Sequence, residues 1–258
     1  MVDTSLHVQS QGEGPELVLV HGWGLNADVW EELAARLAES YRVTVVDLPG
    51  HGRSPLIPGG YTLEALAKAL AEALPQGATW VGWSLGGLIC QAVALAHPAS
   101  VERLILVCSS PRFVRGTEWH CGIDPGLLTQ FGWDLATDFR GTLLRFLSLE
   151  ARGSEHAREE LRALRERIFR HGEPAMEAVQ GGLRLLGGSD LRASLNAMGC
   201  PVRMILGERD QLVPATTLGA VRALCDRVEG AVIQGAAHAP FLSHRSLFTR
   251  QLEEYLPQ

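Results

Sequence analysis

Short runs of apolar residues recur along the first and last parts of the chain, separated by segments with apolar residues at helical spacing. The runs are continuous rather than alternating, which is typical of strands buried on both faces of a parallel sheet. These runs predict strands at residues 17–20, 42–46, 79–81, 101–108, 202–206 and 231–234. The segments between them predict helices near residues 26–37, 62–74, 85–97, 215–225 and 247–255.

The alternation of strand and helix stops between residues 112 and 190, where the pattern is helical and amphipathic. Strands alternating with helices predict an α/β fold with a mostly parallel, doubly wound sheet. Such sheets bind ligands beyond the carboxyl ends of their strands, so the helical block is expected to cover that edge. We therefore predict a core made of residues 1–111 and 191–258 and an inserted helical cap at residues 112–190.

Composition narrows the class of protein. The chain has 258 residues, of which 46% are hydrophobic and 20% charged, enough to bury a substantial core. Its net charge of −6 argues against partners such as nucleic acid or anionic membranes. The uncharged stretch at residues 73–101 is interrupted by glycines and prolines, so we expect no membrane span.

The start of the chain and the cysteines predict a compartment. The N-terminus lacks a basic region followed by an apolar one, so no secretory signal is expected. The five cysteines are scattered, with no Cys-x-x-Cys spacing, which indicates free thiols in a reducing environment. We expect a cytoplasmic monomer.

The sequence Gly82-Trp83-Ser84-Leu85-Gly86 lies where a predicted strand passes directly into a predicted helix. A Gly-x-Ser-x-Gly pattern in this context is a nucleophile elbow, which strains the serine backbone and exposes its hydroxyl. Glycine is expected on both sides because a Cβ there would collide with the neighbouring strand or helix. The alternative is a glycine-rich turn that contains a serine by chance.

A serine nucleophile needs a base to accept its proton and a carboxylate to orient that base. Asp210 follows the strand at 202–206, and His238 follows the strand at 231–234 in a loop of small residues. Alone, Asp210 could be a solvated or helix-capping residue, Glu208 is a nearby competitor, and His238 could be structural. Together with Ser84 they have the order Ser, Asp, His at the ends of three buried strands, which predicts a catalytic triad.

An oxyanion hole would come from the backbone N–H of Leu85 and from the loop His21-Gly22-Trp23-Gly24, through the N–H of Trp23. His21 precedes the elbow and more plausibly holds this loop by hydrogen bonds; the same interpretation suits His51. No cluster has the spacing of a metal site, and we expect neither metal nor cofactor.

Three motifs, namely the His21–Gly24 loop, the turn Asp47–Ser54 and the elbow, resemble the α/β-hydrolase superfamily, and the likeness spans nearly the whole chain. The chain is most similar to the biotin-pathway pimeloyl-[acyl-carrier protein] methyl ester esterases, the BioH family. Further resemblance comes from Ser109-Ser110-Pro111, the loop Ala237–His244, and the cap segments Arg145–Glu150, Gly181-Gly182-Leu183 and Asp190-Leu191-Arg192.

The resemblance implies a substrate-binding pocket around the triad and oxyanion loop. Its residues would be Trp23, Ser84, Leu85, Phe146, Leu147, Ser148, Leu149, Glu150 and His238. The chain departs from the family pattern at Glu150, where glutamine is expected, and at Gly141, where a carrier-contacting arginine is expected. These departures bear on the carrier protein more than on the esterase activity.

The predicted cap carries positive charge on an acidic chain. Residues 140–170 hold eight arginines and five glutamates, a local charge of +3. On a helix, Arg158, Arg162 and Arg165 share a narrow arc, which could dock an acidic acyl carrier protein. Together with the resemblance, this predicts carrier contacts at Arg140, Arg145, Arg158 and Arg162. The alternative is a solvated face in which Glu155, Glu159 and Glu166 pair with arginines three or four residues away.

The sequence thus predicts a serine carboxylesterase that acts through an acyl-enzyme, and the resemblance implies a methyl ester on a carrier-bound acyl chain. One alternative is a hydrolase of small free substrates: a short-chain carboxylesterase, a thioesterase or a carbon–carbon bond hydrolase. The scaffold supports all of these. A more distant alternative is a ligand receptor that has kept the hydrolase shell.

Overall fold

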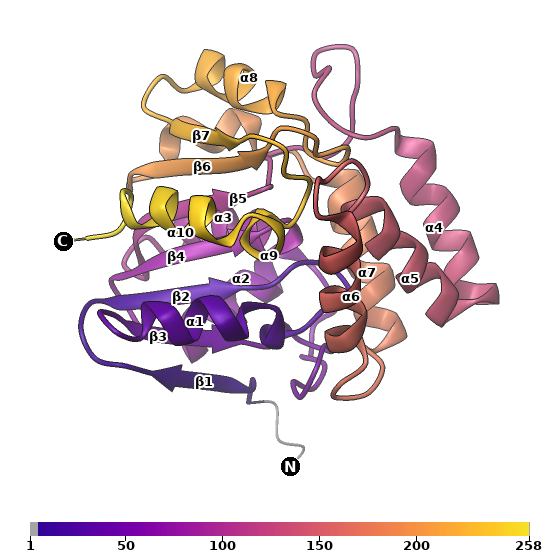
Figure 1. The fold of residues 1–258 in the computed structure, drawn as a ribbon, viewed down its shortest axis with the longest axis horizontal. Coiled ribbons are helices and arrows are strands. Elements are labelled where there is room, and N and C mark those ends of the chain that lie inside the picture. Colours follow the sequence, from indigo (N-terminus) through magenta and orange to yellow (C-terminus); the bar gives the residue numbers. More distant parts are fainter. Residues whose placement is uncertain (1–4, 258) are drawn as a thin grey trace.

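The computed structural model describes residues 5–257 and contains a twisted seven-stranded sheet (Figure 1). The strand order is β1-β3-β2-β4-β5-β6-β7; β1 runs antiparallel to β3 and the other pairs are parallel. The strands are β1 (Val8–Gln11), β2 (Glu16–Val20), β3 (Arg42–Val46), β4 (Ala78–Trp83), β5 (Val101–Val107), β6 (Val202–Gly207) and β7 (Glu229–Ile233). The predicted α/β fold class is confirmed.

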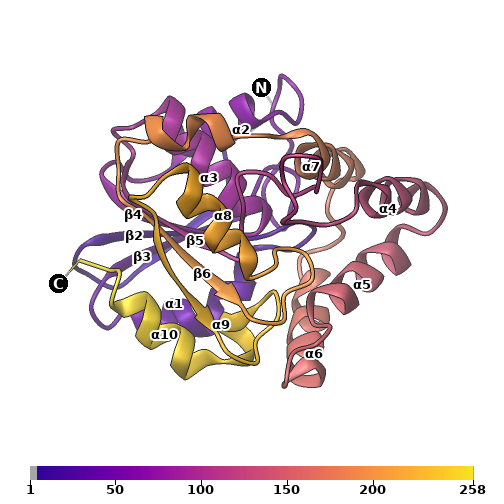
Figure 2. The same cartoon turned by 90° about the horizontal axis from the view of Figure 1, so that it is seen from above.

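Helices cover both faces of the sheet, as Figure 2 shows from above. One face carries α1 (Glu31–Leu37) and α10 (Arg245–Glu253). The other face carries α2 (Leu63–Ala73), α3 (Leu85–Ala96) and α8 (Thr216–Leu224). The central strands β2 and β4 are therefore buried on both sides, which is why their sequences read as continuous apolar runs.

Local capping starts two of the predicted helices. The Thr62 hydroxyl accepts a hydrogen bond from the Ala65 N–H (3.1 Å) at the start of α2. The Asn26 side chain accepts one from the Asp28 N–H (3.1 Å), but it opens a short 3₁₀ turn, η1 (Ala27–Trp30), and the α-helix α1 begins only at Glu31. Side-chain oxygens at these positions satisfy backbone donors that have no partner inside the helix.

Strand β1 was not predicted. It forms one edge of the sheet. Three of its four residues are polar and exposed, and the fourth, Val8, is apolar and half-buried. An exposed edge strand needs no apolar run, so hydrophobic patterning does not reveal it. Two further short elements were also not anticipated: the 3₁₀ helix η2 (Arg192–Ala197) and the single turn α9 (Pro240–Ser243).

Four α-helices lie between β5 and β6, beyond the carboxyl ends of the strands (Figure 1). We call them the cap helices: α4 (Pro125–Thr137), α5 (Phe139–Glu150), α6 (Ala157–Ile168) and α7 (Met176–Gly188). The buried Arg167 of α6 joins them to the core, since its side chain donates to the Asp28 carbonyl (3.0 Å) and to Glu32 (3.2 Å). Among the described residues, no helix has both the length and the apolar character that crossing a membrane requires.

Candidate active site

Ser84 occupies the sharp turn between β4 and α3. Its φ of 53° lies in the left-handed region, which is strained for a residue with a Cβ. Neighbouring strands hold this conformation: the Ser84 N–H donates to the Val107 carbonyl (3.0 Å), and the Ser109 hydroxyl donates to the Ser84 carbonyl (2.8 Å). Only glycine fits beside it, because a Cβ on Gly86 would lie 2.4 Å from the His21 carbonyl oxygen.

The structure brings Ser84, His238 and Asp210 together from three separate loops. His238 Nε2 lies 2.8 Å from Ser84 Oγ, and His238 Nδ1 lies 2.7 Å from Asp210 Oδ2. The other Asp210 oxygen accepts from the N–H groups of Leu212 (2.8 Å) and Val213 (3.0 Å). With Nδ1–H donating to the carboxylate, Nε2 is left to accept the serine proton.

The loop that carries His238 is packed closely against the end of β6. Its backbone is held at two points: the Trp83 indole N–H donates to the His238 carbonyl (2.8 Å), and the His238 N–H donates to the Glu150 carbonyl (3.2 Å). A Cβ on Gly207 would lie 2.0 Å from the Ala237 carbonyl oxygen, so glycine is required there. Small residues in the loop therefore let the imidazole reach a serine on another strand.

Leu85, predicted to form an oxyanion hole with Trp23, belongs to the elbow, and the loop of Trp23 lies beside it. Within residues 5–257, neither backbone N–H makes a hydrogen bond to another group of the protein. The Trp23 indole N–H donates to the Val179 carbonyl of α7 (2.8 Å), which fixes the loop. Two donors left unpaired beside a buried serine are what an oxyanion would need.

His21 and His51 support these loops rather than the reaction. The Leu48 N–H donates to His21 Nε2 (2.9 Å), and His21 Nδ1–H donates to the Gly22 carbonyl (2.8 Å). Burial lowers the pKa of His21, and burial together with the neighbouring His21 lowers the pKa of His51 to about 3. Both imidazoles are neutral, as expected for structural histidines.

The cap helices close over the elbow. The Phe146 ring of α5 lies 4.5 Å from the Trp23 ring, centroid to centroid. On α7, a Cβ on Gly182 would lie 2.5 Å from the Trp23 ring and 3.0 Å from the Leu85 side chain. Of the other residues expected in the acyl pocket, Leu147 and Glu150 are buried, whereas Ser148 and Leu149 are half-buried on the same helix.

The four arginines expected to contact a carrier protein differ in their surroundings. Arg140 pairs with Glu173 (3.2 Å) and lies over the Phe169 ring, and Arg145 pairs with Asp138 (3.0 Å). Arg158 and Arg162 are exposed on α6, where Arg162 lies 3.9 Å from Glu166.

The alternative of a solvated ion-pair face holds only in part. Glu166 lies 3.9 Å from Arg162, which precedes it by four residues, and Glu155, just before α6, pairs with Arg209 of the core (2.9 Å). Glu160, counted among the charges of this block, is buried.

One group of potential metal ligands occurs within the described residues: Cys108, Asp210 and His238, whose donor atoms all lie within 4.8 Å of one another. Their bonding does not suit a metal. Asp210 and His238 already bind each other, and burial raises the pKa of the Cys108 thiol well above its usual range, which keeps it protonated. Cys108 has a φ of 44° and its thiol donates to the Ala237 carbonyl (3.8 Å), so it supports the His238 loop.

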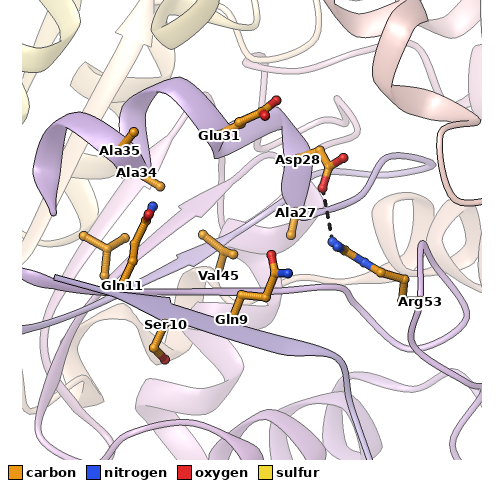
Figure 3. A pocket seen from close by; sticks show the side chains of 11 residues that line it. Gln9, Ser10, Gln11, Ala27, Asp28, Glu31, Ala34, Ala35, Val45 and Arg53 are labelled. Carbon is orange, nitrogen blue, oxygen red and sulfur yellow. Dashed lines mark hydrogen bonds and ion pairs between the residues drawn. The ribbon is translucent and has the colours of Figure 1, made fainter.

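Ser84 and His238 are almost completely shielded from solvent, at 2% and 0% exposure. The groove of about 640 Å³ in Figure 3 lies elsewhere, between β1 and α1, where Arg53 pairs with Asp28 (3.1 Å). None of the residues that line it was predicted for the site.

The fold and this arrangement of serine, histidine and aspartate define an α/β hydrolase. The family model described as alpha/beta hydrolase fold matches residues 15–245. A pimeloyl-[acyl-carrier protein] methyl ester esterase from Xanthomonas campestris pv. campestris (strain B100) is 44% identical, over 97% of this chain and 98% of its own length. The chain belongs to the α/β-hydrolase family and, within it, to the family of these esterases.

A second relative of the same name and a solved esterase structure are also similar to this chain. The enzyme of the same name from Stenotrophomonas maltophilia (strain K279a) is 43% identical, over 97% of this chain and 96% of its own length. Among solved structures, an esterase from Exiguobacterium antarcticum superposes with a TM-score of 0.85 at 25% identity, covering 97% of this chain and 94% of the other.

Sequence reasoning missed several residues that hold the site. Ser109 and the Trp83 indole fix the backbone at Ser84 and His238, and Cys108 supports the same loop. The burial of Glu160 has a signal in the sequence, namely its helical spacing. It lies four and eight residues before the buried Leu164 and Ile168, on the same face of the helix.

Proposed function

We propose that this protein is a serine carboxylesterase that hydrolyses the methyl ester of pimeloyl-[acyl-carrier protein]. One observation carries the proposal: Ser84 Oγ lies 2.8 Å from His238 Nε2, in a chain 44% identical to esterases of that name. The reaction class follows from the geometry, and the substrate follows from the relatives.

In the first half of the reaction, His238 Nε2 takes the proton of Ser84 as Oγ bonds to the ester carbonyl carbon. The N–H groups of Trp23 and Leu85 stabilise the oxyanion, and Asp210 stabilises the imidazolium. The intermediate collapses as its carbon–oxygen bond to the methoxy group breaks. Nε2–H protonates that oxygen, methanol leaves, and Ser84 is acylated.

In the second half, His238 Nε2 takes a proton from water as the water oxygen attacks the acyl carbon. The same two N–H groups stabilise the second tetrahedral intermediate. The bond to Ser84 Oγ breaks, Nε2–H returns its proton to Oγ, and the free acid leaves. The net reaction consumes one water and needs no metal or cofactor.

The substrate pocket lies between the elbow and the cap. We place the ester beside Trp23, Ser84, Leu85 and His238, with the acyl chain along Phe146 and the stretch 147–150 of α5. The contact between the Phe146 and Trp23 rings supports this position. We assign residues 112–190 to a cap that moves to admit substrate, and residues 1–111 and 191–258 to the core.

The carrier protein would dock on the cap through basic side chains. Arg158 and Arg162 are the best candidates, because both are exposed and α6 offers them few acidic partners. Arg140 and Arg145 are already paired with carboxylates, so they would contribute less. This activity would fit a cytoplasmic monomer.

The test compares hydrolysis of pimeloyl-[acyl-carrier protein] methyl ester with that of free methyl pimelate and p-nitrophenyl butyrate. We expect the highest kcat/KM for the carrier-bound ester, and a loss of activity on all three in Ser84→Ala. The inactive variant should unfold at the same temperature as wild type, since Ser84 is a small side chain.

Two results would contradict the proposal. Equal kcat/KM values for carrier-bound and free esters would indicate a general carboxylesterase. Unchanged turnover in Ser84→Ala would show that Ser84 is not the nucleophile.

A further inference from the structure

Two carboxyl side chains are buried beside the His238 loop without a cationic partner. Glu150 is the last residue of α5 and Glu160 lies in α6; each is 1% exposed. Within residues 5–257, none of the four carboxyl oxygens makes a hydrogen bond of regular geometry, although three donor groups lie near Glu160. Glutamate is almost never fully buried unless it is paired, and the steps of ester hydrolysis use neither side chain.

Both residues belong to the contact between the cap and the catalytic loop. The Glu150 carbonyl accepts the hydrogen bond of the His238 N–H (3.2 Å). Helix α6 packs on α9, which begins at Pro240 just after this loop, and Figure 1 shows the two helices as neighbours. Both residues therefore adjoin backbone that positions His238.

The ionisable groups that face the pair are all acids. Glu150 faces Glu160 and Asp210, and Glu160 faces Asp210 and the thiol of Cys108. The other groups near Glu160 are uncharged hydrogen-bond donors, the hydroxyls of Ser154 and Ser243 and the N–H of Ala239. They lower the pKa of Glu160, but the effect of burial is larger.

Two basic side chains of neighbouring loops interact with a different carboxylate, that of Glu155. Arg209 pairs with Glu155 (2.9 Å), and His244 lies 4.0 Å from the same carboxylate. No cation faces the buried pair among the described residues.

Burial without a cation favours the neutral acid. Desolvation and the neighbouring carboxyl raise the pKa of Glu150 well above its usual range. Desolvation raises the pKa of Glu160 to about 8. At neutral pH the fold therefore holds two carboxylic acids here.

We propose that Glu150 and Glu160 are positioning residues that hold the His238 loop as neutral acids, and that their ionisation releases the loop and ends turnover at alkaline pH. An ionised carboxylate in this place meets a second acid, the carboxylate of Asp210 and no counterion. It moves toward water and draws the end of α5 away from His238. The inference rests on the proposed function only for its activity readout.

This predicts a pH profile that the triad alone does not give. A serine hydrolase limited by its histidine gains activity as the imidazole loses its proton and then stays level at higher pH. Here kcat/KM should fall above about pH 8, by about tenfold per pH unit once one deprotonation inactivates the enzyme.

The experiment measures kcat/KM for p-nitrophenyl butyrate from pH 6 to 10, corrected for spontaneous hydrolysis. The variants are Glu160→Gln, Glu150→Gln and the double variant, each compared with its own neutral plateau. We expect Glu160→Gln to move the alkaline fall upward by about one pH unit or more, and the double variant to stay level. Glu159→Gln, an exposed neighbour on α6, should follow wild type.

A second measurement needs no substrate. Between pH 4.5, the ordinary value for glutamate, and about 8, the native state keeps a proton on Glu160 that the unfolded chain has lost. Stability therefore falls as pH rises through this window. The thermal midpoint of wild type should decrease from pH 5 to 8 more steeply than that of Glu160→Gln.

The outcomes are distinguishable. Identical alkaline limbs or identical stability slopes in wild type and Glu160→Gln would overturn the inference. Absence of ester hydrolysis at every pH would defeat the proposed function, and the stability slopes would then still decide whether the pair is neutral.

Discussion

Asp210 divides its two carboxylate oxygens between the catalytic histidine and the backbone. One oxygen accepts from His238 Nδ1 and the other from the N–H groups of Leu212 and Val213. The side chain thus fixes both its own loop and the tautomer of the imidazole. Glu208, the competing carboxylate in the same loop, accepts instead from the Gly235 N–H (2.9 Å) and is partly exposed.

The variant Asp210→Asn should keep the fold and lose activity. Its amide oxygen can accept the two backbone bonds, but its NH₂ group would face Nδ1. The imidazole would then carry its proton on Nε2, where it cannot accept the proton of Ser84. We expect kcat for p-nitrophenyl butyrate to fall by about 10³–10⁴-fold, with the thermal midpoint little changed.

Glu208→Gln is the matched control and should retain most of its activity, because the amide oxygen can still accept from Gly235. The reverse ranking, with Glu208→Gln inactive and Asp210→Asn active, would reassign the carboxylate of the triad.

At the scale of elements, α7 brings the cap onto the oxyanion loop because it presents glycine there. The backbone of Gly182 passes so close to Trp23 that a Cβ would lie 2.5 Å from its ring. Glycine in a helix interior normally costs stability, by about 1 kcal/mol relative to alanine. Here the cost is offset by the close packing of α7 on Trp23 and Leu85.

The variant Gly182→Ala should therefore destabilise the protein, although alanine is the better helix former. We expect a loss of about 1–3 kcal/mol in urea unfolding, since the Trp23 ring or α7 must shift. Activity should fall as well, because Trp23 carries one proposed oxyanion donor.

Gly187→Ala in the same helix is the control. Its Cβ would meet only Leu128, at 3.7 Å, which is ordinary contact. This variant should gain up to about 1 kcal/mol. Equal effects at the two positions would show that α7 does not press on the oxyanion loop.

At the scale of the whole molecule, charge is distributed unevenly over an acidic chain. The formal net charge is −6, yet residues 140–170 carry a formal charge of +3, and exposed arginines of this block lie on both α5 and α6. Two arginines of the block are used internally, since Arg167 and Arg170 bind acidic residues of the core. Arg158 and Arg162 are exposed on α6, where Arg162 has only a 3.9 Å contact with Glu166, so both could contact an acidic partner.

The double variant Arg158→Gln, Arg162→Gln should weaken only the carrier-bound substrate. Exposed interfacial charges act mainly on the rate of association. We expect KM for pimeloyl-[acyl-carrier protein] methyl ester to rise about fivefold or more at low salt, with kcat and the kinetics on free methyl pimelate unchanged. The effect should shrink as salt is added.

Arg250→Gln controls for the loss of one positive charge away from α6, half the change in net charge of the double variant. Arg250 is exposed on α10, which lies away from α6 in Figures 1 and 2. A similar rise in KM in this control would assign the effect to overall charge instead of a docking surface.

Much of the fold and the three triad side chains could be predicted because the signals are local. A strand buried on both faces needs an apolar run such as Leu17–Val20, and a strand that turns into a helix within one residue needs the glycines around Ser84. Strand β1 lacks such a signal, since an exposed edge tolerates the polar residues Gln9 and Ser10.

The sequence by itself determined the order of strands and helices, the elbow and the three loops that carry Ser84, Asp210 and His238. Each depends on a few consecutive residues and their periodicity. Only the tertiary structure decided which faces meet: α7 over Trp23, Cys108 behind the histidine loop, and Glu160 under α9 instead of in solvent. Burial of such residues depends on partners distant along the chain, and a helical pattern fixes a face without saying what will cover it.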